Sequence, residues 1–336
     1  MTSDARPATL QDVADRAGVA RGTASSALSG KGRMSDATRR RVRHAAAELG
    51  YVANSVARNL RAARSGAVGM YFPDRALGFR YYMEVAFGAV ERALQDDLLV
   101  TLLPSDGASD APFARQLDGF MVIDPQDGDP VIERLLRSGR PVVSGERTPV
   151  ELPAPAGLVH SDHEAGIRAV LDHVRERGGR RILCVLPDAS TDWGRALLAG
   201  CRSWSAENDL PLDILAVAFD STTDELRTAA ETRLAANPGV DAVIGARDGA
   251  ALMLVDILRT AGRAIGHDIL LASYVDGEAL ALVEPAITAM DLHPREMGRL
   301  CAELLLETMA DPGGGPRAVD LPIDLVERAS TKALVR

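Results

Sequence analysis

Cysteine is scarce in this sequence. Only three occur in 336 residues, Cys184, Cys201 and Cys301, and they lie far apart, each within an apolar stretch. A disulfide framework shows an even set of cysteines at close and regular spacing, which this chain lacks. We interpret the three residues as buried free thiols of a protein in a reducing compartment.

Long apolar runs are missing too. No stretch approaches the ~20 apolar residues that a membrane-spanning helix requires, and the N-terminus shows no charged-then-apolar leader. These two features predict a cytoplasmic protein that makes no membrane contact.

The motifs of common enzyme classes do not occur. There is no nucleophile elbow, no dinucleotide-binding glycine fingerprint and no paired-carboxylate motif. The glycine run 313–316 is not followed by the Lys-Ser/Thr of a phosphate-binding loop. Four residues near one another, His160, Asp162, His163 and His173, lack the helix-phase spacing of a zinc site, and we interpret them as polar loop residues beside a cleft. The sequence predicts neither an enzyme nor a metal or other cofactor.

Charge is distributed very unevenly along the chain. The whole sequence carries a net charge of −9, yet residues 1–65 hold 12 basic and 5 acidic residues, a local charge of +7. The remaining residues hold 26 basic and 42 acidic ones, a charge of −16. A basic segment of this size is typical of a surface that contacts phosphates, whereas the acidic remainder argues against extended nucleic-acid contact elsewhere.

The basic segment has the pattern of a helix-turn-helix. Leu10, Val13, Ala14 and Ala17 follow one helical face, and Thr9 with Asp12 forms a capping-box-like start. The triplet 18–20 begins with a glycine suited to a left-handed turn. A second helix is predicted over 21–29, in the position that enters a DNA major groove.

A third helix and a short connector follow. Ser35 is the predicted N-cap, and Val42, Ala46 and Leu49 are predicted to face inward. The outer face is predicted to begin with Arg39, Arg40, Arg41 and Arg43. After Gly50, the segment 51–61 contains only about two turns of helix beyond Asn54. A helix of that length is not stable alone, so we expect it to fold only when a partner stabilises it.

These residues carry a family resemblance. The strings T-L-x-D-V-A-x-x-A-G-V, S-D-A-T-R-x-x-V, L-G-Y and N-S-V-A-R-N-L resemble the headpiece and hinge of the LacI/GalR family of bacterial transcriptional repressors. The resemblance implies base contacts by Arg21, Gly22 and Ser26. It implies phosphate contacts by Thr9, Thr23, Ser25, Ser29, Ser35 and Thr38, and minor-groove hinge contacts by Asn54, Ala57 and Leu60, of which Leu60 is an apolar wedge.

The headpiece departs from the family pattern at several positions. Ala20 stands where the family usually has a Ser N-cap, Ser26 replaces a common Arg, and Ala53 replaces a Pro. Gly22 offers no side chain to a base. We therefore expect direct readout to centre on Arg21, with more of the specificity from hinge kinking and DNA shape.

From residue 67 onward, short apolar runs alternate with helical patterns, which predicts parallel sheets covered on both faces. Two such series indicate two Rossmann-like lobes with a cleft between them. The strands are predicted at 68–72, 98–103, 119–123, 141–144, 181–186, 214–219, 242–245 and 269–273. The helices are predicted at 81–96, 131–137, 164–177, 194–208, 224–236 and 250–261.

This body resembles the LacI/GalR core, which is similar to periplasmic sugar-binding proteins. The supporting strings lie at 162–166, 178–182, 241–244 and 287–290, and the segment 105–117 is shorter than the corresponding helix of relatives. The resemblance implies three crossings between the lobes. The expected organisation is a headpiece (1–53), a hinge (54–65), lobe one (66–159 plus 291–318), an effector-binding lobe two (160–290 plus 319–330) and a tail (331–336).

The resemblance also places an effector pocket. It implies roles for Tyr81, Tyr82, Glu146, Trp193, Arg195, Phe219, Arg247 and Asp276, the last because Val275 occupies the usual acidic position and Leu197 the usual arginine position. Aromatic rings with charged groups suit sugar stacking and hydroxyl recognition. The two tyrosines are also compatible with a purely structural role, as is Arg247 paired with a neighbouring acid. The substitutions leave an anionic or otherwise atypical effector open.

The sequence thus predicts a dimeric repressor that binds a pseudo-palindromic operator and responds to a small effector, a sugar or sugar derivative. A sensor that takes a nucleoside or other metabolite as co-repressor is the alternative. A transport solute-binding protein would lack the headpiece, and an enzyme would need motifs that are missing. No heptad-patterned tail follows Lys332, which favours a dimer over a tetramer.

Overall fold

The computed structural model describes residues 8–28, 34–51, 65–73, 79–103, 116–218 and 221–332. The chain forms two compact units, residues 1–65 and 66–336. The predicted hinge contacts at Asn54, Ala57 and Leu60 lie outside the described residues, as do Ser29 and Phe219. The predicted shortening within 105–117 also falls almost entirely outside them.

The N-terminal unit is the predicted helix-turn-helix plus a third helix. It contains α1 (Leu10–Ala17), α2 (Arg21–Leu28) and α3 (Asp36–Glu48). Thr9 and Asp12 form a full capping box, and Gly18 ends α1 in the left-handed conformation with φ 62°. Val13, Ala14, Ala24, Ala27 and Val42 form a small core with no exposed surface. The predicted inward position of Leu49 is wrong, because this side chain is 37% exposed and Tyr51 packs against the core instead.

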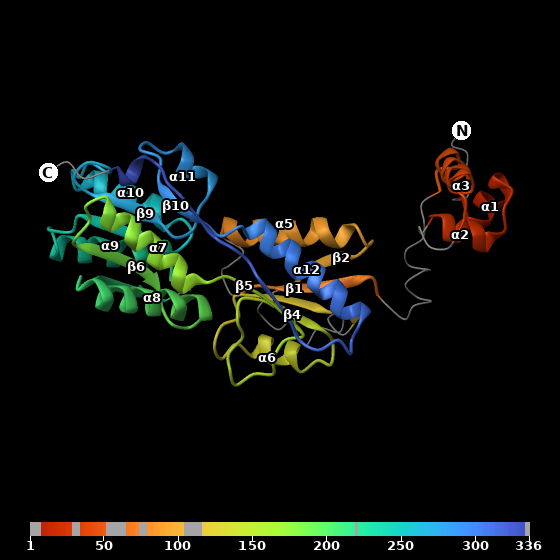
Figure 1. Cartoon of the computed structure of the whole chain (residues 1–336), viewed down its shortest axis with the longest axis horizontal. Coiled ribbons are helices and arrows are strands. Elements are labelled where there is room, and N and C mark those ends of the chain that lie inside the picture. Colours follow the sequence, from red (N-terminus) through yellow and green to blue (C-terminus); the bar gives the residue numbers. More distant parts are fainter. Residues whose placement is uncertain are drawn as a thin grey trace. The chain divides into compact units, whose positions relative to one another are not determined.

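The first lobe of the second unit is a fully parallel six-stranded sheet in the order β11-β5-β4-β3-β1-β2. Figure 1 shows α5 and α12 over one face of this sheet and α6 over the other. Its strands are β1 (Ala67–Tyr71), β2 (Leu99–Leu103), β3 (Phe120–Ile123), β4 (Val142–Gly145), β5 (Gly157–His160) and β11 (Arg317–Asp320). Its helices are α5 (Arg80–Leu94), α6 (Pro130–Leu136) and α12 (Pro294–Ala310).

The second lobe is a six-stranded sheet in the order β12-β10-β9-β8-β6-β7. It is parallel apart from β12, which pairs antiparallel with β10. The strands are β6 (Ile182–Pro187), β7 (Asp213–Val217), β8 (Ala242–Gly245), β9 (Leu270–Ser273), β10 (Thr288–Asp291) and β12 (Asp324–Val326). The helices are α7 (His163–Glu176), α8 (Asp192–Asn208), α9 (Thr223–Ala236), α10 (Ala250–Thr260) and α11 (Glu278–Leu282), with a final 3-10 turn η4 (Ala329–Thr331).

The chain passes between the lobes after β5, after β10 and after β11. Each predicted strand and helix of the body has its counterpart within a few residues. The expectation of wholly parallel sheets is wrong at β12, because the returning chain runs back along the sheet edge. The pattern also assigned no element after 273, although α12 there is one of the longest described helices, with 17 residues.

Candidate functional site: an interlobe cavity and a basic headpiece

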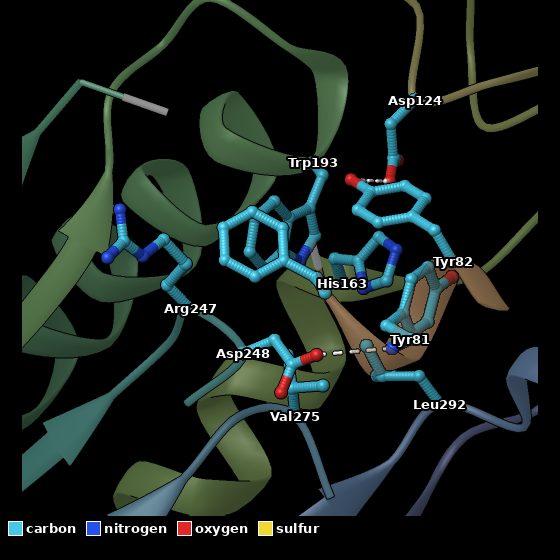
Figure 2. Close-up of a pocket in the computed structure, with 10 residues that line it drawn as sticks. Tyr81, Tyr82, Asp124, His163, Trp193, Arg247, Asp248, Val275 and Leu292 are labelled. Atoms are coloured by element: carbon cyan, nitrogen blue, oxygen red, sulfur yellow. Dashed lines mark hydrogen bonds between the residues drawn. The ribbon is translucent and has the colours of Figure 1, made fainter. Parts of the chain in front are cut away.

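A cavity lies between the two lobes, where strand ends meet helix N-termini (Figure 2). It encloses about 390 Å³ between protein atoms, part of it open to solvent. The edge of an α/β sheet at the carboxyl ends of its strands is the usual ligand position in this architecture. The lining residues are Phe79, Tyr81, Tyr82, Asp124, His163, Trp193, Arg247, Asp248, Val275 and Leu292.

One side of the cavity is aromatic. Tyr81 and Tyr82 begin α5 and stand edge to face with ring centroids 5.1 Å apart. Both tyrosines line the cavity, as the sequence predicted, yet Tyr82 is only 4% exposed and its hydroxyl donates to Asp124 at 2.8 Å. Tyr82 therefore also serves as part of the protein core.

Asp124 is the most perturbed acid of the site. It directly follows β3, adopts a φ of 47° and is buried. Burial, with a further contribution from the negative charge of Glu146, raises the pKa of Asp124 to about 7, although the hydrogen bond from Tyr82 acts in the opposite direction. This carboxyl therefore changes protonation near neutral pH.

A second buried network joins the two lobes. Glu146 follows β4 in the first lobe, and its Oε1 lies 3.1 Å from Nε2 of His163 at the start of α7 in the second. The other ring nitrogen of His163 lies 3.0 Å from the hydroxyl of Tyr274. Burial alone would lower the pKa of His163, but the neighbouring carboxylate of Glu146 outweighs burial and raises it. The interpretation of His160, His163 and His173 as loop residues is wrong, because His160 ends β5 and the other two lie on α7 and are buried.

Buried polar atoms without partners gather at this cleft. Among the described residues, four buried side-chain nitrogen or oxygen atoms have no hydrogen-bond partner. Three belong to residues of the cleft: Oε2 of Glu146, Nε1 of Trp193 and Nε of Arg247. Nearly all buried polar groups are hydrogen-bonded in native proteins, because each one left unpaired costs about 1–3 kcal/mol. The two donors, on Trp193 and Arg247, line the cavity and remain available to a polar ligand, whereas the acceptor belongs to Glu146, which contacts the lining residue His163.

Two residues predicted to bind the effector lie elsewhere. Arg195 donates to Asp127 at 2.6 Å and to the carbonyl of Ala189, so its guanidinium bridges the lobes outside the cavity. The carboxylate of Asp276 accepts hydrogen bonds from both terminal nitrogens of Arg328, at 2.8 and 2.7 Å. This bidentate ion pair occupies both carboxylate oxygens. Glu146 lies behind His163, whereas Trp193 and Arg247 line the cavity.

The sequence reasoning missed several lining residues. Asp124 and Asp248 each come within three residues of a predicted strand end, and that position could have identified them. Asp248 also accepts the backbone N–H of Tyr81 at 3.1 Å, so it caps α5 from the opposite lobe. Phe79, His163 and Leu292 gave no comparable signal, because their place depends on how the two lobes meet.

The headpiece presents the predicted recognition helix. Arg21 and Gly22 are exposed at the start of α2, while Ala24 and Ala27 face the core. Two of the predicted phosphate contacts, Thr9 and Ser35, are N-caps of α1 and α3. The remaining residues predicted to contact DNA that the structure describes, Thr23, Ser25, Ser26 and Thr38, are partly buried.

One arginine of the outer run of α3 is structural. Nε of Arg41 donates to the carbonyl of Ala17 at 2.8 Å and joins α3 to the end of α1.

Among the described residues, no helix is long and apolar enough to cross a membrane, and no three His, Cys, Asp or Glu side chains gather as metal ligands. Cys184, Cys201 and Cys301 are buried free thiols, as predicted.

Comparison with known proteins supports the same two-part organisation. The model of the LacI family of bacterial regulatory proteins matches residues 9–54, and that of the periplasmic binding protein-like domain matches residues 171–331. The chain thus carries a LacI-family helix-turn-helix domain followed by a periplasmic binding protein-like domain. The predicted fold, a helix-turn-helix headpiece with two α/β lobes, is confirmed.

The full-length relatives reported for this chain are transcriptional regulators. The HTH-type transcriptional regulator CelR of Thermobifida fusca is 29% identical over 336 residues, covering 97% of this chain and 98% of the relative. Among solved structures, the complex of the transcriptional regulator CelR with cellobiose is 26% identical, with a TM-score of 0.72, and covers 96% of this chain and 99% of that one. The lac repressor dimer bound to operator and an anti-inducer has a TM-score of 0.72 at 23% identity. The match covers 98% of this chain and 100% of that one, and it shows the shared fold.

Proposed function

We propose that this LacI-family chain is a sequence-specific transcriptional repressor whose operator affinity is controlled by a small neutral carbohydrate in the interlobe cavity. The observation that carries the proposal is that two lining residues of the cavity, Trp193 and Arg247, each hold a buried nitrogen without a protein partner. A third unpartnered atom, Oε2, belongs to Glu146, which contacts the lining residue His163. A ligand that pairs them recovers free energy that the protein spends in keeping them buried.

The chemistry of the lining favours a sugar. The carboxyl groups of Asp124 and Asp248 accept hydroxyl hydrogens, while Arg247 and Trp193 donate to ring or hydroxyl oxygens. The aromatic side stacks on the apolar face of a pyranose. Asp124 and Asp248 line the cavity, and Glu146 lies against the lining histidine, so that among the described residues Arg247 is the only lining cation without an acidic partner of this kind. The anionic effector left open by the sequence therefore receives less support than a neutral one. The solved relative in complex with cellobiose agrees with this choice.

A nucleoside is the second candidate. The rings of Phe79, Tyr81 and Trp193 line the same cavity and offer stacking surfaces to a planar base as well as to a sugar. A ligand screen for this protein should therefore include nucleosides.

The headpiece and hinge supply the response. Arg21, Gly22 and Ser26 are proposed to read bases, and Asn54, Ala57 and Leu60 to enter the central minor groove as two hinge helices that fold together. An effector that changes how the lobes meet would separate the hinges, with a coupling of about 1–3 kcal/mol. Because DNA is its partner, the protein is proposed to work in the cytoplasm and without an enzymatic step.

A second copy of the chain is the proposed partner. On α5 and on the edge strand β2, apolar side chains that do not face the sheet are exposed: Phe87, Val90, Leu94, Leu99 and Leu102. An exposed apolar surface on a helix beside an open sheet edge is typical of a protein–protein interface. A homodimer would cover it and present two headpieces to a pseudo-palindromic operator.

The test combines operator mapping with a ligand screen. Selection from random duplex DNA by the purified full chain should return an inverted repeat, and neutral sugars and nucleosides are then screened for a change in affinity for that duplex. Recovery of no preferred duplex would overturn the DNA-binding proposal. A preferred duplex whose affinity no sugar alters would overturn the carbohydrate effector alone.

A further inference from the structure

A second cavity adjoins the first on the far side of Phe79 and Arg247. It encloses about 710 Å³, part of it open to solvent, and shares three lining residues with the inner cavity: Phe79, Arg247 and Asp248. Its other walls come from Thr223 and Leu226 of α9 and from Ala250 and Met253 of α10. We call the first space the inner cavity and the second the outer cavity.

The partition between the two cavities consists of side chains. The Arg247 guanidinium carbon lies 5.5 Å from the centre of the Phe79 ring. One terminal nitrogen of Arg247 donates to the carbonyl of Ser221 at 2.6 Å, but Nε is unpartnered in a residue that is only 8% exposed. Figure 2 shows the Arg247 side chain extending away from Asp248, whose carboxylate faces Tyr81. The residues that separate the two spaces, Phe79, Arg247 and Asp248, are therefore the ones that line both.

We propose that the effector site spans both cavities and that the effector is a neutral two-unit sugar. One ring would occupy the inner cavity and the second ring the outer cavity, with the linkage beside Phe79 and the free Nε of Arg247 supplying a hydrogen bond to it. This inference rests on the proposed carbohydrate response and adds the size of the ligand.

The lining of the outer cavity suits a sugar ring more than an anionic group. Phe79, Leu226 and Met253 give it apolar surface, which a pyranose face covers and a phosphate does not. The guanidinium of Arg80 at its rim is already bound by Glu278 at 3.0 Å and Glu84 at 3.4 Å. Asp248 adds a carboxylate that would repel an anion and accept a hydroxyl.

The first experiment compares matched ligands on the full-length protein. Glucose, galactose, mannose and xylose are titrated by calorimetry alongside cellobiose, maltose, lactose, mannobiose and xylobiose. We expect at least one two-unit sugar to bind 10-fold or more tightly than its own component monosaccharide. A monosaccharide that binds as tightly as every disaccharide containing it would overturn the two-cavity site while leaving the carbohydrate response standing.

The second experiment fills the outer cavity. Thr223 is exposed at the first turn of α9 and lines this cavity, so Thr223→Trp places a large ring there without disturbing the buried core. The variant should lose at least 10-fold in disaccharide affinity and less than twofold in monosaccharide affinity. Thr232→Trp, an exposed threonine on the same helix away from both cavities, is the matched control and should change neither.

The outcomes separate the two proposals. Equal loss for both sugar classes in Thr223→Trp, or no loss for either, contradicts the outer ring position. If none of the nine sugars binds, the carbohydrate proposal itself fails and the two-cavity inference fails with it.

Discussion

At the residue scale, the cleft combines strained backbone with buried polar atoms that have no hydrogen-bond partner. Asp124 and Glu146 are non-glycine residues with positive φ, and both are buried acids that directly follow strands. Strained backbone and unpaired polar atoms persist where the surrounding structure holds them and where a function repays the cost. The grouping of unpaired polar atoms on Glu146, Trp193 and Arg247 is stronger evidence for a binding site than any single residue type.

Trp193 gives the most direct test of the unpartnered atoms. Trp193→Phe keeps an aromatic ring but removes the Nε1–H that has no protein partner. Because a lost neutral hydrogen bond to a ligand is worth about 1 kcal/mol, effector affinity should fall about five- to tenfold with little change in thermal stability. Calorimetric titration and thermal unfolding measure the two effects.

Trp204→Phe is the matched control. The Nε1 of this second buried tryptophan donates to Asp172 at 2.8 Å, so its removal should lower stability and leave effector affinity unchanged. The reverse pattern in the two variants would remove Trp193 from the binding site.

Asp124 predicts a pH dependence of stability. Its pKa is about 7 in the folded protein, above the ordinary value of 3.8, so the unfolded chain releases this proton first as pH rises. Stability should therefore fall from about pH 4 and level off above pH 7. Asp124→Asn keeps an acceptor for Tyr82 and removes the titration, so its stability relative to wild type should be about 2 kcal/mol higher at pH 8 than at pH 5.

Urea unfolding followed by tryptophan fluorescence checks this, since both tryptophans, Trp193 and Trp204, lie in the second unit. A difference between variant and wild type that does not change with pH would show that Asp124 is ionised throughout the range.

At the element scale, the closest helix packing in the core depends on two glycines. A Cβ on Gly88 of α5 would lie 1.9 Å from the carbonyl oxygen of Arg295, and one on Gly298 of α12 would lie 1.8 Å from that of Val85. The two helices therefore meet backbone to backbone. This contact fixes α5, whose first turn carries the aromatic side of the cavity.

Gly298→Ala should destabilise the core by about 3 kcal/mol or more, because a backbone carbonyl cannot yield to a methyl group without moving a helix. Gly277→Ala is the control, since its added Cβ would meet nothing within 4 Å. The midpoint of urea unfolding measures both. Similar midpoints for the two variants would show that α5 and α12 separate at little cost.

At the scale of the whole molecule, charge is divided between a +7 segment at residues 1–65 and a −16 remainder. Operator affinity should therefore fall steeply with salt, because each phosphate contact releases counterions. Effector affinity should change little, because the cavity is buried and its proposed ligand is neutral.

Arg21→Ala should relax base preference at one position in each operator half-site, by about 1–3 kcal/mol against the wrong base. Selection from random duplexes by wild type and variant measures this preference. An unaltered motif would show that Arg21 contacts only the DNA backbone.

The sequence alone determined the local features of this protein. The helical stripe from Leu10 to Ala17, the N-caps at Thr9 and Ser35 and the alternation of strands with helices are short-range patterns, since capping, turns and periodicity involve residues a few positions apart. Local strings of this kind carried the family resemblance, and the resemblance in turn implied Tyr81, Tyr82, Trp193 and Arg247 as cavity residues.

Only the tertiary structure decided which side chains meet across the lobes. Three crossings bring Glu146 of one lobe to His163 of the other and Asp248 to the first turn of α5, whereas Arg195 and Asp276 are engaged by Asp127 and Arg328 instead. Such pairings depend on contacts between residues far apart in the chain. No local pattern encodes them, because each requires both lobes to be folded and in contact.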